Sequence, residues 1–143
     1  MRISAKGEYA LKAMLDLSLQ PPRRIVPIQE IAARQGIPQR YLEQVLQALK
    51  RAGLLASRRG AAGGYQLARA PEDITAGDWL RAVEGAQAPF EARNGGRGAR
   101  RDDLGELWEE IGRAVCEVVD RLSIGGLAER ARARAGAQPM YHI

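Results

Sequence analysis

A glycine and a proline two residues apart constrain the fold of this chain more than any other feature. Gly36 ends an apolar-striped segment that begins near Pro27, and Pro38 begins the next such segment. Glycine readily ends a helix and proline suits a first turn, so the sequence predicts two helices joined by about three residues. A connection this short is typical of a helix-turn-helix.

A further helix precedes this pair and a hairpin follows it. Ser4 fits the N-cap of a helix of about 15 residues, which Pro21 and Pro22 end. Two short strand candidates, residues 54–57 and 65–68, lie downstream of the last helix. The segment PQRYLEQVLQALKRAG (38–53) has apolar residues at the spacing of one helix face, namely Leu42, Val45, Leu46 and Leu49.

The stretch SRRGAAGGYQL (57–67) lies between the two strand candidates. A phosphate-binding P-loop would end in Gly-Lys-Ser/Thr and lead into a helix, but this loop ends in Gly-Gly-Tyr and leads into a strand pattern. Its glycines permit positive φ and a tight reversal, which predicts a hairpin, or wing. Arg58 and Arg59 then lie at the base and flank of a thin tip, which can follow a DNA backbone or enter a minor groove.

The exposed face of the predicted helix 38–53 carries amides and cations. Glutamine can form two hydrogen bonds with adenine, and arginine can do so with guanine, so this face has the chemistry to read bases. An ordinary solvated helix face is the competing interpretation. The residues of this face are Gln39, Arg40, Glu43, Gln44, Gln47, Lys50 and Arg51.

Positive charge gathers in the same part of the chain. Residues 1–85 contain 13 Lys and Arg against 8 Asp and Glu, whereas residues 86–143 contain nine of each. A local basic excess is expected of a protein that binds a polyanion. No apolar run approaches the roughly 20 residues of a membrane span, and no signal-peptide core follows the N-terminus. We therefore expect a cytoplasmic protein with DNA, and no membrane, as its partner.

The fold class that follows is mainly α with a small β-hairpin. We expect a winged helix-turn-helix over residues 1–85, a flexible loop over 86–103, and a long dimerisation helix followed by a C-terminal helix over 104–143. Six apolar residues recur at spacings of four and three, which is typical of a seam between helices. Packing within one chain is the alternative to dimerisation. The seam residues are Leu104, Trp108, Ile111, Val115, Val118 and Leu122.

Three segments resemble the IscR/NsrR/CymR family of bacterial winged-helix regulators, also called the Rrf-two family. They are MRISAKGEYALKAMLDL, IQEIAARQGIPQRYLEQVLQALKRAGLLASRRGAAGGYQLAR and PEDITAGDWLRAVEG, which cover most of residues 1–85. The resemblance implies a homodimeric transcription factor on a palindromic operator, and we expect a repressor. It also implies that Lys6 contacts a backbone phosphate and that Arg59 lies at the minor groove. The resemblance further implies that four residues lie at the major groove, namely Arg40, Tyr41, Glu43 and Gln44.

The chain departs from this family in its cysteines. Cluster-binding members carry three cysteines before the long helix, whereas residues 86–103 contain none. Cys116, the only cysteine, lies beside the apolar seam, where we expect a small core residue far from cations rather than a sensor; His142 is the only histidine. We therefore expect no iron–sulfur cluster, metal or other cofactor. The sequence leaves open whether a small molecule or a protein acts as an effector. The arginines at 93, 97, 100 and 101 would suit an anionic ligand, a protein partner or DNA.

Two other functional classes compete with the DNA-binding regulator. An enzyme or nucleotide-binding domain that uses the glycine loop would need a catalytic triad, a P-loop lysine or a metal set, and the sequence offers none of them. A protein-interaction regulator of the same fold that has lost specific operator binding is the closer alternative, although the basic face over residues 1–85 speaks against it.

Overall fold

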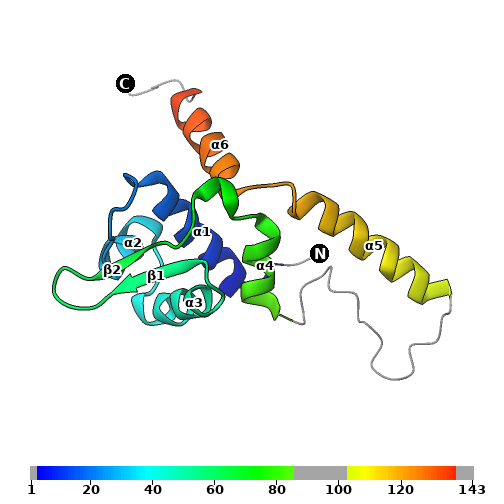
Figure 1. Ribbon diagram of the computed structural model, residues 1–143, viewed down its shortest axis with the longest axis horizontal. Coiled ribbons are helices and arrows are strands. Elements are labelled where there is room, and N and C mark those ends of the chain that lie inside the picture. The colour runs from blue at the N-terminus through cyan, green and yellow to red at the C-terminus, as the bar shows by residue number, and fades with distance from the viewer. Residues whose placement is uncertain (1–2, 86–102, 138–143) are drawn as a thin grey trace.

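The computed structural model describes residues 3–85 and 103–137 (Figure 1). This part of the chain is mainly helical, with one two-stranded hairpin, which confirms the predicted fold class. The predicted loop 86–103 lies outside the described residues, except for Asp103 at the start of a helix. The elements are α1 (Ala5–Leu19), α2 (Ile28–Gln35), α3 (Gln39–Arg51), β1 (Leu55–Arg58), β2 (Gly64–Leu67), the 3₁₀ turn η1 (Pro71–Asp73), α4 (Ala76–Glu84), α5 (Asp103–Val119) and α6 (Ile124–Ala137).

Helix α1 is the centre of the core, because α2, α3, α4 and α6 all pack against it. Its start is capped as predicted, since the Ser4 hydroxyl accepts a hydrogen bond from the Gly7 N–H at 3.0 Å. The apolar stripe predicted on α3 faces this core. All four of its residues, Leu42, Val45, Leu46 and Leu49, are fully buried.

The predicted helix-turn-helix is formed by α2 and α3. Gly36 adopts the left-handed conformation (φ 65°), and the Ile37 N–H donates to the Ala32 carbonyl, which closes the end of α2. Pro38 then caps α3. Pro27 is the N-cap of α2 and so lies one position before the first-turn site predicted for it.

The wing is an antiparallel hairpin in which Leu55 pairs with Leu67 and Arg58 with Gly64. Its strands are shifted by one residue from the predicted ranges 54–57 and 65–68. The hairpin also has a third partner that no sequence pattern predicts, because Val26 and Tyr65 exchange two backbone hydrogen bonds of 2.9 Å each. This bridge fastens the base of the wing to the segment that leads into α2.

The predicted seam assumes one helix from Leu104 to Leu122, but α5 ends at Val119, so this part of the prediction was wrong. The Leu122 carbonyl accepts a hydrogen bond from the Ala76 N–H, and the Ile124 N–H donates to the Ile74 carbonyl, both at 2.7 Å. The chain leaves the helix to make these long-range bonds, which an apolar period cannot reveal. In Figure 1 α5 extends away from the helical body, at the end opposite the wing.

Candidate nucleic-acid interface

The exposed face of α3 carries the residues predicted to read bases. Gln39, Arg40, Glu43 and Gln44 are all exposed, because the opposite face of the helix is buried in the core. Tyr41 differs from them. It is half-buried, and its ring meets that of Tyr9 edge to face with 5.4 Å between centroids. Tyr41 therefore borders this surface and also ties α3 to α1.

The wing places its two arginines where the hairpin turns. Arg58 is the last residue of β1 and Arg59 follows it, and both are exposed. The turn depends on glycine, because a Cβ at Gly63 would collide with the backbone carbonyl of Arg58. Gly60 has a φ of 107°, a conformation that other residues rarely adopt.

Lys6 lies in the first turn of α1 and is half-buried. Nearby, the hydroxyl of Ser4 donates a 2.6 Å hydrogen bond to Glu84, which joins the start of α1 to the end of α4. A buried bond from the Trp79 indole N–H to the Gly7 carbonyl, 2.9 Å long, joins the same two helices. The segment that carries Lys6 is thus held firmly to the body.

The described cations fall into two groups. One group forms ion pairs with carboxylates: Lys12, Arg24, Arg34, Arg69 and Arg81. The second group has no ion pair with a carboxylate within residues 3–85 and 103–137. It includes the cations of α3 and the wing together with Lys6. Unpaired surface cations are the groups that a phosphate backbone can engage without breaking an existing ion pair. These residues are Lys6, Arg40, Lys50, Arg51, Arg58 and Arg59.

A groove of about 510 Å³ separates the wing from α3 and the start of α2. We call it the wing groove. One of its lining residues, Gln29, could not be predicted from the sequence, because only the fold brings the start of α2 next to the wing. The groove is lined by Pro27, Ile28, Gln29, Gln47, Lys50, Ser57, Arg58, Arg59, Gly60, Ala61, Gly63, Gly64 and Tyr65.

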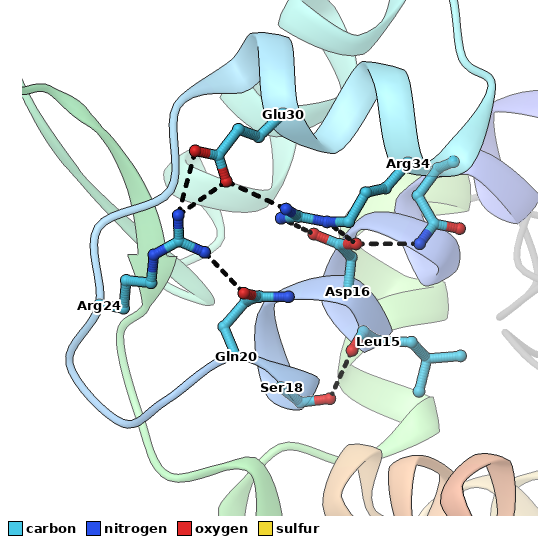
Figure 2. Close-up of polar contacts among 8 residues, drawn as sticks. Leu15, Asp16, Ser18, Gln20, Arg24, Glu30 and Arg34 are labelled. Atoms are coloured by element: carbon cyan, nitrogen blue, oxygen red, sulfur yellow. Dashed lines mark hydrogen bonds and ion pairs between the residues drawn. The ribbon is translucent and has the colours of Figure 1, made fainter. Parts of the chain in front are cut away.

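A polar network fixes the first helix of the helix-turn-helix (Figure 2). The buried Asp16 carboxylate of α1 accepts two hydrogen bonds of 2.9 Å from Arg34 of α2 and one of 3.0 Å from Gln35. Glu30 bonds both Arg34 and Arg24. The bond from Arg34 is the main reason why the pKa of Glu30 is lowered. Sequence reasoning missed this network, since charges 18 positions apart carry no local signal.

A second ion pair joins α4 to the end of α5. Arg81 donates to both carboxylate oxygens of Asp120, at 2.8 and 3.0 Å, and this lowers the pKa of Asp120. The guanidinium also lies 3.8 Å from the sulfur of Cys116, which is half-buried. The expectation that Cys116 lies far from cations was therefore wrong, because α4 brings Arg81 to it.

The predicted seam of α5 divides into two parts. Leu104 and Trp108 are each 64% exposed, and Val118 and Ile111 are 50% and 39% exposed. Leu107, which was not predicted, joins this exposed apolar stripe at 47%. Val115 and Leu122 instead pack against the core of their own chain.

The described residues contain no group of three or more His, Cys, Asp or Glu side chains placed to hold a metal ion. His142 lies outside the described residues. Within the described ranges no helix combines the length and apolar character needed to cross a membrane.

Comparison with known proteins places this geometry in context. The profile of the Rrf2 family, described as iron-dependent transcriptional regulators, matches residues 3–130. The chain is 40% identical over 128 residues to the HTH-type transcriptional regulator CymR of Bacillus subtilis, covering 90% of each protein. It is 36% identical over 129 residues to the regulator IscR of Aliivibrio salmonicida, covering 89% of this chain and 77% of that protein.

Solved structures agree with these sequence matches. The structure of CymR, the global cysteine regulator of B. subtilis, superposes with a TM-score of 0.76 at 36% identity and covers 91% of this chain and 98% of its own. The structure of T. potens IscR superposes with a TM-score of 0.78 at 33% identity and covers 100% of this chain and 97% of its own.

Proposed function

The chain belongs to the Rrf2 family of transcriptional regulators, and we propose that it acts in the cytoplasm as a homodimeric repressor on a palindromic DNA operator. The observation that carries this proposal is the set of exposed amides and unpaired cations on α3 and the wing. They lie on α3 and the wing, whereas Arg24, Arg34 and Arg81 elsewhere in the domain pair with carboxylates. The family is one of regulators and not of enzymes.

Within this proposal α3 enters the major groove. Arg40 and Gln44 supply the side chains that hydrogen-bond base edges, since guanine and adenine offer matching acceptors and donors there. Gln39 and Glu43 lie on the same exposed face and complete the readout, and Tyr41 lies at its border.

The wing and α1 add contacts that position the protein. Arg59 enters the minor groove, where negative potential attracts arginine, and Arg58 lies at the base of the same hairpin. Lys6 contacts a backbone phosphate, so its role is independent of sequence.

A titration of the purified chain against DNA tests the proposal. We would select binding duplexes from a random library and compare them with scrambled duplexes at two salt concentrations by fluorescence anisotropy. A regulator of this kind binds its selected sequence at least about a thousand-fold more tightly than the scrambled one, and both affinities fall with salt. Salt-dependent binding without sequence preference would instead support the alternative, a protein-interaction regulator that has lost specific operator binding.

We propose that this member works without an iron–sulfur cluster, although its family is described as iron-dependent. Such clusters are held mainly by several cysteine thiolates, and this sequence contains one cysteine and one histidine. Two Cys116 residues of a dimer would still leave a cluster half-ligated.

Anaerobic purification with iron and sulfide tests this second part. We expect a colourless protein that binds its selected duplex. A brown protein with cluster absorbance that Cys116→Ser abolishes would contradict it.

A further inference from the structure

We infer that the ion pair between Arg81 of α4 and Asp120 fixes the direction in which α5 leaves the winged domain, and with it the half-site spacing that the homodimer accepts. The inference rests on the proposed function, because spacing matters only to a dimer on a palindrome. Neither residue lies on α3 or in the wing, so both are positioning residues and not DNA ligands. We call this contact the α4–α5 joint.

Helix α5 is attached to the body at one end. Its residues that pack against the core, Val115, Cys116 and Val119, lie in its second half, whereas its first half extends away from the body (Figure 1). Leu104 and Trp108, which are predicted to meet the second copy, lie in that first half. A helix of 17 residues is about 26 Å long, so a turn of roughly 10° at the joint moves its far end by about 4–5 Å. This displacement exceeds one base-pair step of about 3.4 Å, so a small change at the joint alters the spacing between half-sites.

The backbone fixes the place where α5 ends. Just after the helix, the Leu122 carbonyl accepts a hydrogen bond from the Ala76 N–H, and the Ile124 N–H donates to the Ile74 carbonyl, both at 2.7 Å. These bonds lie beyond the last turn, so they anchor the chain at one place without setting the direction of the helix. The apolar packing of α5 is not directional either. A contact of defined geometry on the helix itself is therefore needed to set its direction.

The guanidinium of Arg81 supplies this contact at two points. It donates to both carboxylate oxygens of Asp120, at 2.8 and 3.0 Å, and it lies 3.8 Å from the Cys116 sulfur, one turn earlier. Asp120 is held in line with α5, because its N–H donates to the Cys116 carbonyl at 2.9 Å. Two parallel hydrogen bonds to a carboxylate add a geometric specificity that a single contact lacks. Arg81 therefore holds the last turn of α5 in one orientation on α4.

Gly77 of α4 makes room for the joint. A Cβ at this position would collide with the Asp120 carboxylate and would lie 2.7 Å from a guanidinium nitrogen of Arg81. The carboxylate approaches α4 this closely only because residue 77 has no side chain. Alanine is normally preferred to glycine inside a helix, so the stability of α4 does not explain a glycine here. The close approach of Asp120 does.

The exposure of the pair separates a positioning role from a structural one. The Arg81 and Asp120 side chains are 37% and 44% exposed. Exposed ion pairs add little to stability, because water screens their charges. Loss of this pair should therefore leave the domain folded while the direction of α5 becomes less fixed.

The test compares duplexes that differ in the spacing of their half-sites. Fluorescence anisotropy measures binding of the full chain to the selected palindrome and to the same palindrome with one base pair inserted or removed at its centre. A duplex with a single half-site is measured alongside. The wild type should bind the altered spacings at least about ten-fold more weakly than the selected one, because a rigid dimer then engages only one half-site well.

Three variants should reduce this spacing preference several-fold and leave the affinity for the single half-site unchanged. Arg81→Lys keeps the charge but loses the two parallel hydrogen bonds. Asp120→Asn removes the charge of the acceptor, and Gly77→Ala keeps both charges but displaces the carboxylate. Glu117→Gln is the matched control, because it removes an exposed carboxylate three residues before Asp120 and should keep the wild-type preference. Circular dichroism checks that all four variants keep the helical fold.

The outcomes separate this inference from the function on which it rests. A wild-type chain that shows no sequence preference, or that sediments as a monomer, would refute the proposed function itself. A dimeric and specific wild type whose variants Arg81→Lys and Gly77→Ala keep its spacing preference would overturn the role of the joint alone. So would an equal loss of affinity for every duplex, the single half-site included, since damage to the fold has that effect. A specific wild type that binds all spacings equally would also overturn it, because no rigid joint would then set the distance.

Discussion

Asp16 shows how one side chain can hold the DNA-binding unit together. Among the charged residues that the structure describes, it alone is buried, with 3% of its surface exposed. A buried carboxylate is costly unless it is paired, and here Arg34 and Gln35 satisfy it (Figure 2). Its three hydrogen bonds therefore fix α2 on α1. Because the turn to α3 begins at the end of α2, these bonds also fix the start of the turn that orients α3.

Asp16→Ala should lower the free energy of unfolding by about 1–3 kcal/mol, because it removes three hydrogen bonds to a charged carboxylate. The loss should stay below that of a fully buried pair, because Arg34 is partly exposed and keeps Glu30 as a partner. Urea denaturation of the full chain measures it. Glu8→Ala, which removes a surface pair with Lys12, is the control. Similar shifts of both midpoints would show that Asp16 does not have this role.

Arg40 and Gln44 carry the prediction for sequence readout. Arg40→Ala and Gln44→Ala should each cost about 1–3 kcal/mol of discrimination between the selected and the scrambled duplex. Lys6→Ala should weaken binding to both duplexes alike, because a phosphate contact carries no sequence information. The affinities for the two duplexes give the ratio directly. An unchanged ratio in both α3 variants would mean that another surface reads the bases.

At the scale of elements, the end of α5 depends on a contact with α4. The bond from Arg81 lowers the pKa of Asp120 below its ordinary value of 3.8. The Asp120 carboxylate therefore stabilises the folded state at neutral pH, and this contribution disappears as the pH falls through its lowered pKa. Asp120 is partly exposed, so solvent screens the pair and the effect is modest.

Asp120→Asn should therefore lower the urea midpoint at pH 7 more than at pH 3, because pH 3 lies below the ordinary pKa of 3.8 and part of the stabilisation by the ion pair is lost there. The matched control is Glu117→Gln, since Glu117 is an exposed carboxylate of α5 three residues before Asp120, without an ion pair in the described structure. Its substitution should show no such difference between the two pH values. The difference in urea midpoint between the wild type and Asp120→Asn should be smaller at pH 3 than at pH 7. An equal difference at both pH values would contradict the role of the ion pair.

Local patterns predicted the elements but not the contacts between distant ones. The buried stripe of α3 and the turn at Gly36 follow from spacing and backbone preference, and the structure has both. The pairing of Val26 with Tyr65 joins segments about 40 residues apart, and no local pattern encodes such a bond. For the same reason the sequence could not show that Leu122 leaves the long helix to bond Ala76.

The residues of the candidate site also fall into two groups, those that local patterns predicted and those that only the fold brings together. The exposed residues of α3 and the arginines of the wing were predicted from amphipathic spacing and glycine content. Gln29 joins them only because the bridge at Val26 brings the start of α2 to the hairpin. Similarly, Cys116 was predicted to lie far from cations, and its proximity to Arg81 arises from the packing of α5 on α4.

At the scale of the whole molecule, α5 presents an apolar stripe with no cover from its own chain in the described structure. Four of its residues, Leu104, Leu107, Trp108 and Val118, are exposed by 47–64%. Burying such a stripe against a second copy would remove this apolar area from water. The 17 residues of α5 span about 26 Å at 1.5 Å per residue, a length suited to setting two α3 helices about one DNA turn apart.

Trp108→Glu should therefore convert a homodimer into a monomer, because it would place a charge in the apolar contact. Val115→Glu is a poorer probe, since Val115 packs on the core of its own chain and its substitution would also disturb folding. Arg113→Glu introduces the same side chain on the opposite face of α5, where it should leave assembly intact.

Sedimentation at micromolar concentration gives the mass, and anisotropy gives the affinity for the selected duplex. A monomer that has lost one half-site contact should bind the palindrome at least about a hundred-fold more weakly, since linking two sites raises affinity by that factor or more. A wild-type chain that sediments as a monomer, or a Trp108→Glu variant that stays dimeric, would place the dimer contact outside this stripe.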